Sequence, residues 1–380
     1  MVYRVIGLMS GSSLDGLDIA FVEFHEQAGA WTYEIKATEC YAYSPEWIER
    51  LKKATSLNAL DYQLLHTAYG HYTGQLVNAF IEEYGLDYQV QLIASHGHTT
   101  FHVPAQKMTA QLGDGAAIAA VTGINVVSDL RAMDLALGGH GAPIVPIGEK
   151  LLLKDYPLFL NIGGIANVSC NLTNNYIAFD VCPANRVLNM LANKAGKPYD
   201  EGGQMAAGGA LQPELLKTLN SLEYYQLPAP KSLANDFGTD VVFPLVTGSR
   251  FSTKDTWIQD SLRTYVEHIA IQVKKALEPV AAPNSLLPTP DPGLSTPHSR
   301  LLITGGGSHN TFLVQRLTAL LSDINISVVV PDKQLADFKE AIIMGLIGVL
   351  RWREENNVLA SVTGSLRNSI GGAVWIGQEA

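Results

Sequence analysis

A strand, glycine turn, strand pattern occurs twice in this sequence and constrains the fold more than any other feature. Residues 5–24 read VIGLMSGSSLDGLDIAFVEF, in which two apolar runs flank glycine, serine and aspartate. Residues 158–172 read LFLNIGGIANVSCNL, with a glycine pair between two similar runs. Small residues of this kind suit a tight turn between strands. Each stretch therefore predicts a β-hairpin, and the repetition indicates two halves of similar architecture.

Between residues 57 and 84, apolar side chains recur at helical spacing, which predicts a long amphipathic helix. Ser56 is the expected N-cap, and Gly85 is expected to end the helix. The apolar positions expected to face the core are Leu60, Leu64, Ala68, Leu76, Phe80 and Tyr84.

Helices and strands alternate along the rest of the chain. The predicted strands cover residues 90–94, 126–128, 176–180, 301–304 and 326–330, with a hairpin turn at Asn174-Asn175. The predicted helices start near Asp114 and cover residues 183–195, 256–277, 311–321 and 335–353. This alternation predicts an α/β fold in which helices cover mixed sheets.

A length of 380 residues favours two domains over one. We expect an N-terminal lobe formed by residues 1–135 together with about 355–380, and a C-terminal lobe formed by residues 136–354. Six prolines within residues 279–300 are too many for a helix or a central strand, so this segment is predicted to be a surface loop.

The formal net charge of −10 excludes general binding to nucleic acid through a basic surface, although a local anion pocket is allowed. The apolar run before Ser10 is too short for a secretory signal, and the run at 341–350 is too short to cross a bilayer. Three unevenly spaced cysteines provide neither a disulfide framework nor a metal-binding spacing. These observations predict a cytoplasmic protein without membrane contact, and they leave a homodimer open.

The glycine turns are candidate phosphate sites, because backbone N–H groups converge on a phosphate only where side chains leave room. Asp15 and Asp18 are placed to hold Mg²⁺ through water beside the phosphates. A third cluster, at residues 305–307, lies between a predicted strand and a helix opened by Asn310. The predicted ATP-binding residues are Gly11, Ser12, Ser13, Leu14, Asp15, Gly16, Leu17, Asp18, Asn161, Gly163, Gly164, Gly305, Gly306 and Gly307.

Neither a Walker loop nor a G-x-G-x-x-G turn after the first strand occurs in the sequence. Six motifs in order instead resemble the anhydro-N-acetylmuramic acid kinases. They are MSGSSLDGLD at 9–18, SHGHTTFHVP at 95–104, QLGDGAAIA at 111–119, GGHGAPIVP at 138–146, NIGGIANVS at 161–169 and SVTGS at 361–365, and they span nearly the whole chain.

This resemblance implies a two-lobed, actin-like fold of the sugar kinase and actin ATPase type, with an interdomain cleft. It also implies that ATP and Mg²⁺ are the cofactors, and that the protein works in cell-wall recycling. In that family, phosphorylation is coupled to the opening of a 1,6-anhydro ring by water, which gives N-acetylmuramic acid 6-phosphate.

Asp180 ends the predicted strand 176–180 and is the candidate general base. A carboxylate there can take a proton from the water that attacks the anomeric carbon, while the released 6-oxygen meets the γ-phosphoryl group. The family pattern has an aspartate base at the matching position. The residues alone leave open a second interpretation, in which Asp180 caps the helix that follows Pro183.

Three further residues are predicted to bind the sugar. Arg131 offers a fork of N–H donors for a sugar oxygen or a carboxylate, and Asp129 and Asp134 are candidates for orienting it. Glu340 resembles the family's sugar-binding glutamate, although an exposed helical charge is the alternative. The third residue is His98.

His96, His98 and His102 form an H-x-H-x-x-x-H pattern, and two imidazoles on one strand face would suit zinc. No fourth ligand follows nearby in the sequence. Because the resemblance places this stretch beside the sugar, we expect these side chains to hydrogen-bond substrate or backbone instead.

Three departures from the family pattern concern the substrate. Ala132 and Met133 follow Arg131 where the family carries further arginines, and Val181-Cys182 replaces Thr-Gly beside the candidate base. The segment that begins at Lys231 lacks the family's arginine. These changes leave three alternatives: a kinase of a different anhydrosugar, a sugar kinase that acts without ring opening, and a non-catalytic relative that only binds nucleotide or sugar.

Overall fold

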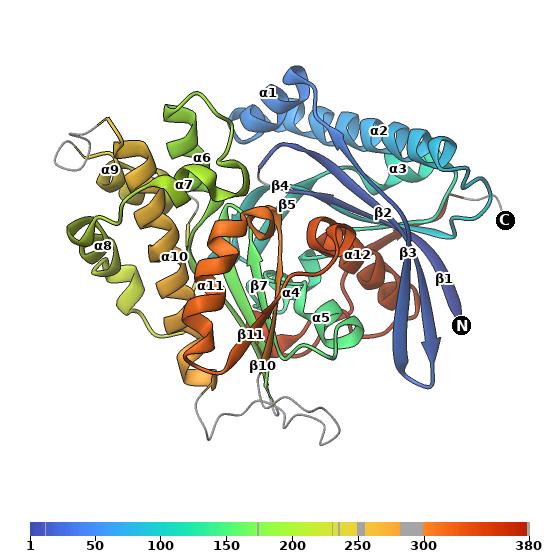
Figure 1. Ribbon diagram of the computed structural model, residues 1–380. Coiled ribbons are helices and arrows are strands. Elements are labelled where there is room, and N and C mark those ends of the chain that lie inside the picture. The colour runs from blue at the N-terminus through green and yellow to red at the C-terminus, as the bar shows by residue number, and fades with distance from the viewer. Residues whose placement is uncertain are drawn as a thin grey trace. The chain divides into compact units, whose positions relative to one another are not determined.

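The computed structural model describes residues 1–11, 13–172, 175–229, 231–234, 236–248, 255–281 and 299–377 (Figure 1). The chain divides into two compact units. Unit 1 combines Met1–Lys154 with Phe338–Ala380, and unit 2 is Asp155–Asp337. Each unit has its own mixed sheet with helices, so the predicted α/β class is confirmed.

The unit boundaries differ from those predicted at residues 135 and 355. Most of one helix, α12 (Lys333–Trp352), belongs to unit 1 because it packs closely on the first strand. A side chain at Gly7 would collide with the carbonyl of Ala341, so only glycine permits this approach. The sequence pattern of α12 carries no sign of which sheet it covers.

The sheet of unit 1 has seven strands in the order β12-β6-β4-β1-β2-β3, with β5 paired to β4. Strands β1, β4 and β6 are parallel, so their carboxyl ends lie at one edge. The strands are β1 (Val2–Ser10), β2 (Gly16–Gln27), β3 (Ala30–Ala42), β4 (Leu92–Val103), β5 (Met108–Leu112), β6 (Val126–Ser128) and β12 (Ala373–Trp375).

Helices pack on the sheet of unit 1. Side chains of α2 share one core cluster with Ile6 and Leu8. Helix α12 meets the sheet at Gly7, which lies between these two residues in β1 and therefore belongs to the opposite face of the sheet. Figure 1 shows α2 and α3 lying side by side. Besides α12 these elements are α1 (Pro45–Lys53), η1 (Ala54–Ser56), α2 (Ala59–Glu83), η2 (Pro104–Gln106), α3 (Gly115–Thr122), α4 (Ala132–Ala136), α5 (Pro146–Leu152) and α13 (Ala360–Thr363).

The predicted buried face of α2 is partly wrong. Leu60 and Leu64 are 69% and 60% exposed, and the core is filled instead by the neighbouring stripe that includes Leu65 and Tyr69. The N-cap is Asn58 rather than Ser56, because Ser56 lies in the short helix η1. Packing against the sheet therefore selects the stripe with the large aromatic rings over the one richer in leucine near the start of the helix.

The sheet of unit 2 has the order β11-β10-β7-β8-β9. Strand β10 is parallel to β7 and β11, and two successive antiparallel pairs make β9 run in the direction of β7. The strands are β7 (Leu158–Ile162), β8 (Ile165–Asn171), β9 (Tyr176–Pro183), β10 (Ser299–Thr304) and β11 (Ile326–Val329). The carboxyl ends of β7, β9 and β10 therefore share one edge of the sheet.

The long helix α10 is central to the hydrophobic core of unit 2 and contacts α7, α8 and α11 (Figure 1). The helical elements are α6 (Asn185–Lys194), η3 (Glu201–Gly203), α7 (Gln204–Gly208), α8 (Pro213–Asn220), η4 (Glu223–Gln226), η5 (Phe237–Val242), α9 (Phe243–Val246), α10 (Trp257–Ala281), η6 (Gly306–His309) and α11 (Thr311–Ser322).

The predicted proline-rich loop begins later than expected. Pro279 lies in the last turn of α10, where Val280 and Ala281 still pack against the core. The other prolines of that loop and the turn residue Asn174 lie outside the described residues. Over the described ranges, no helix is both long and apolar enough to cross a membrane.

Candidate active site

The first hairpin turn joins β1 to β2, and Ser12 within it lies outside the described residues. The hydroxyl of Ser13 donates a 2.6 Å hydrogen bond to Oδ1 of Asp15, which also accepts the N–H of Gly16 at 3.2 Å. Leu14 has a positive φ of 60°. The carboxylate of Asp15 thus stabilises the turn by accepting hydrogen bonds from two neighbouring residues.

Three of the predicted nucleotide residues belong to strand β2 rather than to the turn. Leu17 is 2% exposed in the hydrophobic core, and Asp18 pairs with Met9 across the ladder. At Gly16 a side chain would lie 2.6 Å from the carbonyl oxygen of Tyr41. The close packing of β2 against β3 therefore requires glycine at this position, and this requirement is independent of phosphate binding.

Asp15 and Asp18 supply carboxylate oxygens, the ligand class that Mg²⁺ prefers. In the described ranges, no three His, Cys, Asp or Glu side chains gather closely enough to enclose a metal ion. The hairpin thus fits a magnesium ion held largely by water and phosphate oxygens, with one or two carboxylates beside it.

A buried imidazole holds Arg131. The Nε–H of Arg131 donates to Nε2 of His96 at 2.8 Å, and Nη1 donates to the carbonyl of Gly141 at 2.5 Å. On its other side, His96 makes a 2.8 Å hydrogen bond from Nδ1 to the carbonyl of Gly97. Since a carbonyl only accepts, Nδ1 carries the proton and Nε2 is the acceptor for Arg131.

The structure brings Glu340 into the surroundings of Arg131. Burial lowers the pKa of Arg131 to about 10, and the charges of Glu340 and Asp134 oppose that shift. The guanidinium therefore keeps its charge at neutral pH. Glu340 is only half-buried on α12, so the alternative of a fully exposed helical charge does not describe it.

Asp134, one of the two candidate orienting acids, is fully buried. Its carboxylate accepts the N–H of Gly141 and the hydroxyl of Thr363, each at 2.7 Å. A side chain at Gly139 would collide with this carboxylate, so glycine is required there. Asp134 thereby fixes the loop whose Gly141 carbonyl holds Arg131, whereas Asp129 accepts a hydrogen bond from its neighbour Ser128.

The three histidines of β4 do not converge. A bulge at His96-Gly97, where Gly97 has a φ of +72°, breaks the strand alternation that would align their side chains. Nδ1 of His98 hydrogen-bonds Oγ of Ser10 at 3.0 Å, and Nδ1 of His102 lies 3.2 Å from Oγ1 of Thr109. Each ring thus has a hydrogen-bond partner of its own: Gly97 for His96, Ser10 for His98 and Thr109 for His102.

In unit 2, the parallel strands β7 and β10 bring two glycine turns together. Thr304 pairs with Asn161, and the hydroxyl of Thr304 donates to Oδ1 of Asn161 at 3.3 Å. Gly305 has a φ of +83°, and a side chain there would lie 2.7 Å from that same amide oxygen. The turns at 163–164 and 305–307 thus form one cluster at the sheet edge.

Two residues that sequence reasoning missed complete this cluster. The backbone N–H of Asn185 donates to the carbonyl of Gly163 at 3.0 Å, and its side-chain amide donates to the carbonyl of Ile162 at 3.1 Å. The Nε and Nη2 atoms of Arg186 lie 3.7 Å from the position of a side chain on Gly164. The sequence signal that could have identified Arg186 is a basic residue at the start of the helix that follows the strand of Asp180.

Asp180 lies on β9 and does not cap α6, which begins at Asn185 without a side-chain cap. The capping alternative is therefore wrong. Instead, Oδ2 of Asp180 accepts the N–H of Leu233 at 2.9 Å and lies 3.4 Å from the hydroxyl of Ser232. Burial raises the pKa of Asp180, and these two hydrogen bonds oppose the rise.

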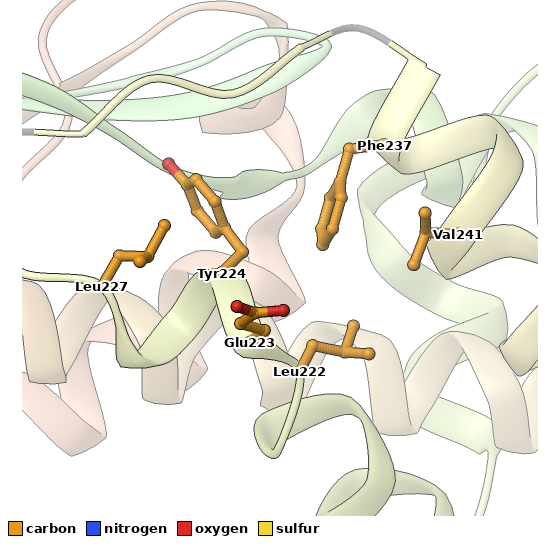
Figure 2. Close-up of a pocket in the computed structure, with 6 residues that line it drawn as sticks. All are labelled: Leu222, Glu223, Tyr224, Leu227, Phe237 and Val241. Carbon is orange, nitrogen blue, oxygen red and sulfur yellow. The ribbon is translucent and has the colours of Figure 1, made fainter.

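An apolar hollow of about 420 Å³ adjoins the segment that holds Asp180. Figure 2 shows Tyr224 and Phe237 standing side by side in it, with ring centroids 5.5 Å apart. The hydroxyl of Tyr224 donates to the backbone carbonyl of Asp180 at 2.8 Å, and Nζ of Lys231 lies 4.5 Å from the Tyr224 ring. Tyr224 therefore links the hollow to the strand of the candidate base.

The departures from the family pattern beside Asp180 point into the core. Val181 and Cys182 are 2% and 0% exposed and belong to the hydrophobic cluster of unit 2. Both side chains are thus accommodated by core packing. Ala132 and Met133, by contrast, are exposed on α4.

Comparison with known proteins shows which sequences this chain resembles. The sequence model of the family described as anhydro-N-acetylmuramic acid kinase matches residues 3–377. The anhydro-N-acetylmuramic acid kinase of Idiomarina loihiensis is 33% identical over 92% of both chains, and that of Coxiella burnetii is 32% identical over 99% of this chain and 98% of its own. Among solved structures, component A of the Acidaminococcus fermentans (R)-2-hydroxyglutaryl-CoA dehydratase aligns at 12% identity and a TM-score of 0.43, over 91% of this chain and 97% of that chain.

The protein is therefore a kinase, an enzyme that transfers a phosphoryl group. More particularly, the chain belongs to the anhydro-N-acetylmuramic acid kinase family, and the sequence-based family assignment is confirmed.

Proposed function

We propose that this kinase acts on 1,6-anhydro-N-acetylmuramic acid with ATP and water, and releases N-acetylmuramic acid 6-phosphate and ADP. The observation that carries the proposal is the position of the Asp180 carboxylate. Asp180 lies on β9, whose carboxyl end is at the same sheet edge as the two glycine turns, and its carboxylate accepts the N–H of Leu233. Family membership supports the same substrate, because the similar proteins bear its name.

Asp180 acts as the general base of this reaction. Its carboxylate takes a proton from the water whose oxygen forms the new bond to the anomeric carbon. The bond between that carbon and the 6-oxygen breaks, and the 6-oxygen forms a bond to the γ-phosphorus of ATP as ADP leaves. The N–H of Leu233 keeps one carboxylate oxygen in place, so the other oxygen is the one that faces the water.

The glycine turns hold the phosphates of ATP. Gly163, Gly164 and Gly305 to Gly307 leave room for backbone N–H groups to approach a phosphate, as do Gly11 and Ser13 of the first hairpin. We assign Arg186 the role of an additional cationic contact, because its guanidinium lies against Gly164. Mg²⁺ beside Asp15 and Asp18 would offset the charge of the transferring phosphoryl group.

The sugar is bound by Arg131, Glu340 and His98. The guanidinium of Arg131, held by His96 and Gly141, presents its remaining N–H groups to a carboxylate or hydroxyl oxygen of the substrate. The muramic acid side chain carries such a carboxylate. We place the reaction in the cytoplasm, in the recycling of cell-wall sugar.

Incubation of the protein with MgATP and 1,6-anhydro-N-acetylmuramic acid in ¹⁸O-labelled water tests the proposal. We expect a ring-opened 6-phosphate with ¹⁸O on the anomeric carbon, detected by mass spectrometry. Intact anhydrosugar with intact ATP would refute the substrate. Phosphorylation of a simple sugar without label from the solvent would instead identify a kinase that acts without ring opening.

A further inference from the structure

Asp180 lies next to an irregularity in β9, the outermost strand of its sheet. Two successive residues of β8 pair with Asp180 and Cys182, so Val181 is an extra residue between them. This bulge explains why the adjacent side chains of Val181 and Cys182 both enter the hydrophobic core, since neighbours in a regular strand point to opposite faces. Pairing with β8 therefore leaves the orientation of the strand at Asp180 incompletely fixed.

Contacts from outside the sheet complete the hold on Asp180. Its backbone N–H donates to the carbonyl of Lys231 at 3.0 Å, and its backbone carbonyl accepts the hydroxyl of Tyr224 at 2.8 Å. The N–H and C=O of one strand residue point to the same side, so both bonds lie on the edge away from β8. The carboxylate in turn accepts the N–H of Leu233. The direction of each bond is unambiguous, because a carbonyl and an ionised carboxylate only accept.

Tyr224 is itself held in place. Nζ of Lys231 donates to the carbonyl of Tyr224 at 2.9 Å and lies 4.5 Å from the centre of its ring, which adds a cation–π attraction. The ring of Phe237 packs beside it, and Figure 2 shows the hydroxyl of Tyr224 pointing away from Leu222 and Val241. Burial raises the pKa of Tyr224, so the hydroxyl keeps its proton and remains a donor at neutral pH.

We infer that Tyr224 is a positioning residue for Asp180. The carbonyl that its hydroxyl binds belongs to the peptide unit between Asp180 and Val181, where the bulge begins. A fixed peptide unit fixes ψ of Asp180, and with it the direction in which the side chain leaves the strand. Because Leu233 occupies Oδ2, Oδ1 is then the oxygen presented to the attacking water, and for this step the inference rests on the proposed function.

The adjacent Tyr225 provides a matched comparison. It lies in the same short helix, η4, and its ring packs against Phe237 and His268. It is 8% exposed, and among the described residues its hydroxyl makes no hydrogen bond. The two neighbouring tyrosines thus differ in whether the hydroxyl contacts the strand of the candidate base. Removal of the Tyr225 hydroxyl takes away a buried polar group without a partner, so catalysis should not suffer.

Steady-state kinetics with MgATP and 1,6-anhydro-N-acetylmuramic acid test the inference. Tyr224→Phe keeps the ring and removes the hydroxyl, so kcat should fall about three- to tenfold, the equivalent of one lost hydrogen bond, while KM for ATP stays as in the wild type. Tyr225→Phe should leave both values unchanged. Equal kcat in Tyr224→Phe and the wild type would overturn the inference, and so would an equal loss in the two variants.

The Asp180→Asn background separates a positioning role from a general structural one. If the hydroxyl acts through the carboxylate of Asp180, Tyr224→Phe should leave the residual rate of Asp180→Asn unchanged. A loss by the same factor in both backgrounds would show that Tyr224 acts independently of the base, and this result would contradict the assignment.

Hydrogen exchange provides a readout that needs no turnover. The amide protons of Asp180 and Leu233 both take part in the bonds that hold the candidate base. Their exchange should be at least about threefold faster in Tyr224→Phe and unchanged in Tyr225→Phe. Wild-type exchange rates at both amides in Tyr224→Phe would refute the positioning role. Failure of the proposed reaction would appear instead as absence of turnover in the wild type, so the two failures are distinguishable.

Discussion

Nε2 of His96 accepts a 2.8 Å hydrogen bond from Nε of Arg131, so a neutral imidazole rather than a carboxylate orients this cation. A carboxylate in the same place would add a further negative charge beside the guanidinium, whereas a neutral imidazole accepts its hydrogen bond without adding to the charges of Glu340 and Asp134. The imidazole is itself fixed by the carbonyl of Gly97, so the pair depends on the bulge in β4.

Replacement of His96 tests this relationship. His96→Leu should raise KM for the sugar about tenfold while kcat changes less, because the guanidinium loses the acceptor that aims it. The matched control is His102→Leu, since His102 bonds Thr109 and makes no hydrogen bond to Arg131 among the described contacts. Steady-state kinetics with varied sugar provide the measurement, and equal KM values in both variants would refute the orienting role.

Asp180→Asn should lower kcat by about 10²–10⁴-fold, because the amide cannot accept the proton of the attacking water. The affinity for ATP, measured by calorimetry, should be retained. Asp155→Asn is a suitable control, since Asp155 is an exposed aspartate of the same unit. Normal turnover in Asp180→Asn would remove this residue from the mechanism.

The pH profile of kcat/KM should show an acid limb that belongs to Asp180. A base works only when it is ionised, so activity rises with pH through its pKa and levels off above it. Because burial raises this pKa, the limb should lie at a higher pH than for an exposed aspartate. Ser232→Ala removes a hydrogen bond that favours the ionised form, so it should move the limb further upward; a downward shift would contradict the assignment.

Two adjacent glycines should differ in their tolerance of alanine. Gly305 combines a φ of +83° with backbone atoms of Ile162 close by, so Gly305→Ala should cost at least about 1–3 kcal/mol in the free energy of unfolding. Around Gly306 the nearest atom to a new side chain is Nδ2 of Asn185 at 3.6 Å, so Gly306→Ala should be nearly neutral for stability. Denaturant unfolding compares them, and equal losses would argue against the left-handed turn at Gly305.

The buried ion pair between Lys339 and Glu149, 2.8 Å apart, lies directly beside Glu340 in the sequence. Lys339→Met leaves a buried carboxylate without its ammonium partner and should cost about 3–5 kcal/mol. In the double variant with Glu149→Leu, much of that loss should be recovered, because both charges are then absent. Unfolding free energies of the two single variants and the double variant measure the coupling, and strictly additive losses would contradict it.

Local signals in the sequence predicted local structure well. Asp114 and Asn310 cap α3 and α11 as expected, because a cap needs only a side-chain oxygen and the next turn of the helix. The exposure of Leu60 and Leu64 could not be predicted in the same way, since two stripes of α2 compete and the sheet decides which of them is buried.

In the candidate site, too, local features can be predicted from the sequence and contacts between distant residues cannot. The glycine turns are contiguous in sequence and can be recognised there, and the family resemblance supplies Asp180, Arg131 and Glu340 as candidates. The acceptor for Arg131 was missed because His96 lies 35 positions away and reaches the arginine only through a bulge. Arg186 was missed because a basic residue at a helix start usually indicates solvent exposure rather than contact with a glycine turn.

The discontinuous course of unit 1 has a consequence for synthesis. Gly7 is shaped to receive the backbone of Ala341, yet the ribosome delivers that segment only after the whole of unit 2 has been made. At the usual pace of translation the delay is on the order of tens of seconds. During that interval one face of the nascent first sheet lacks its native helical cover, so we expect unit 2 to mature first and the earliest residues to need protection by a chaperone.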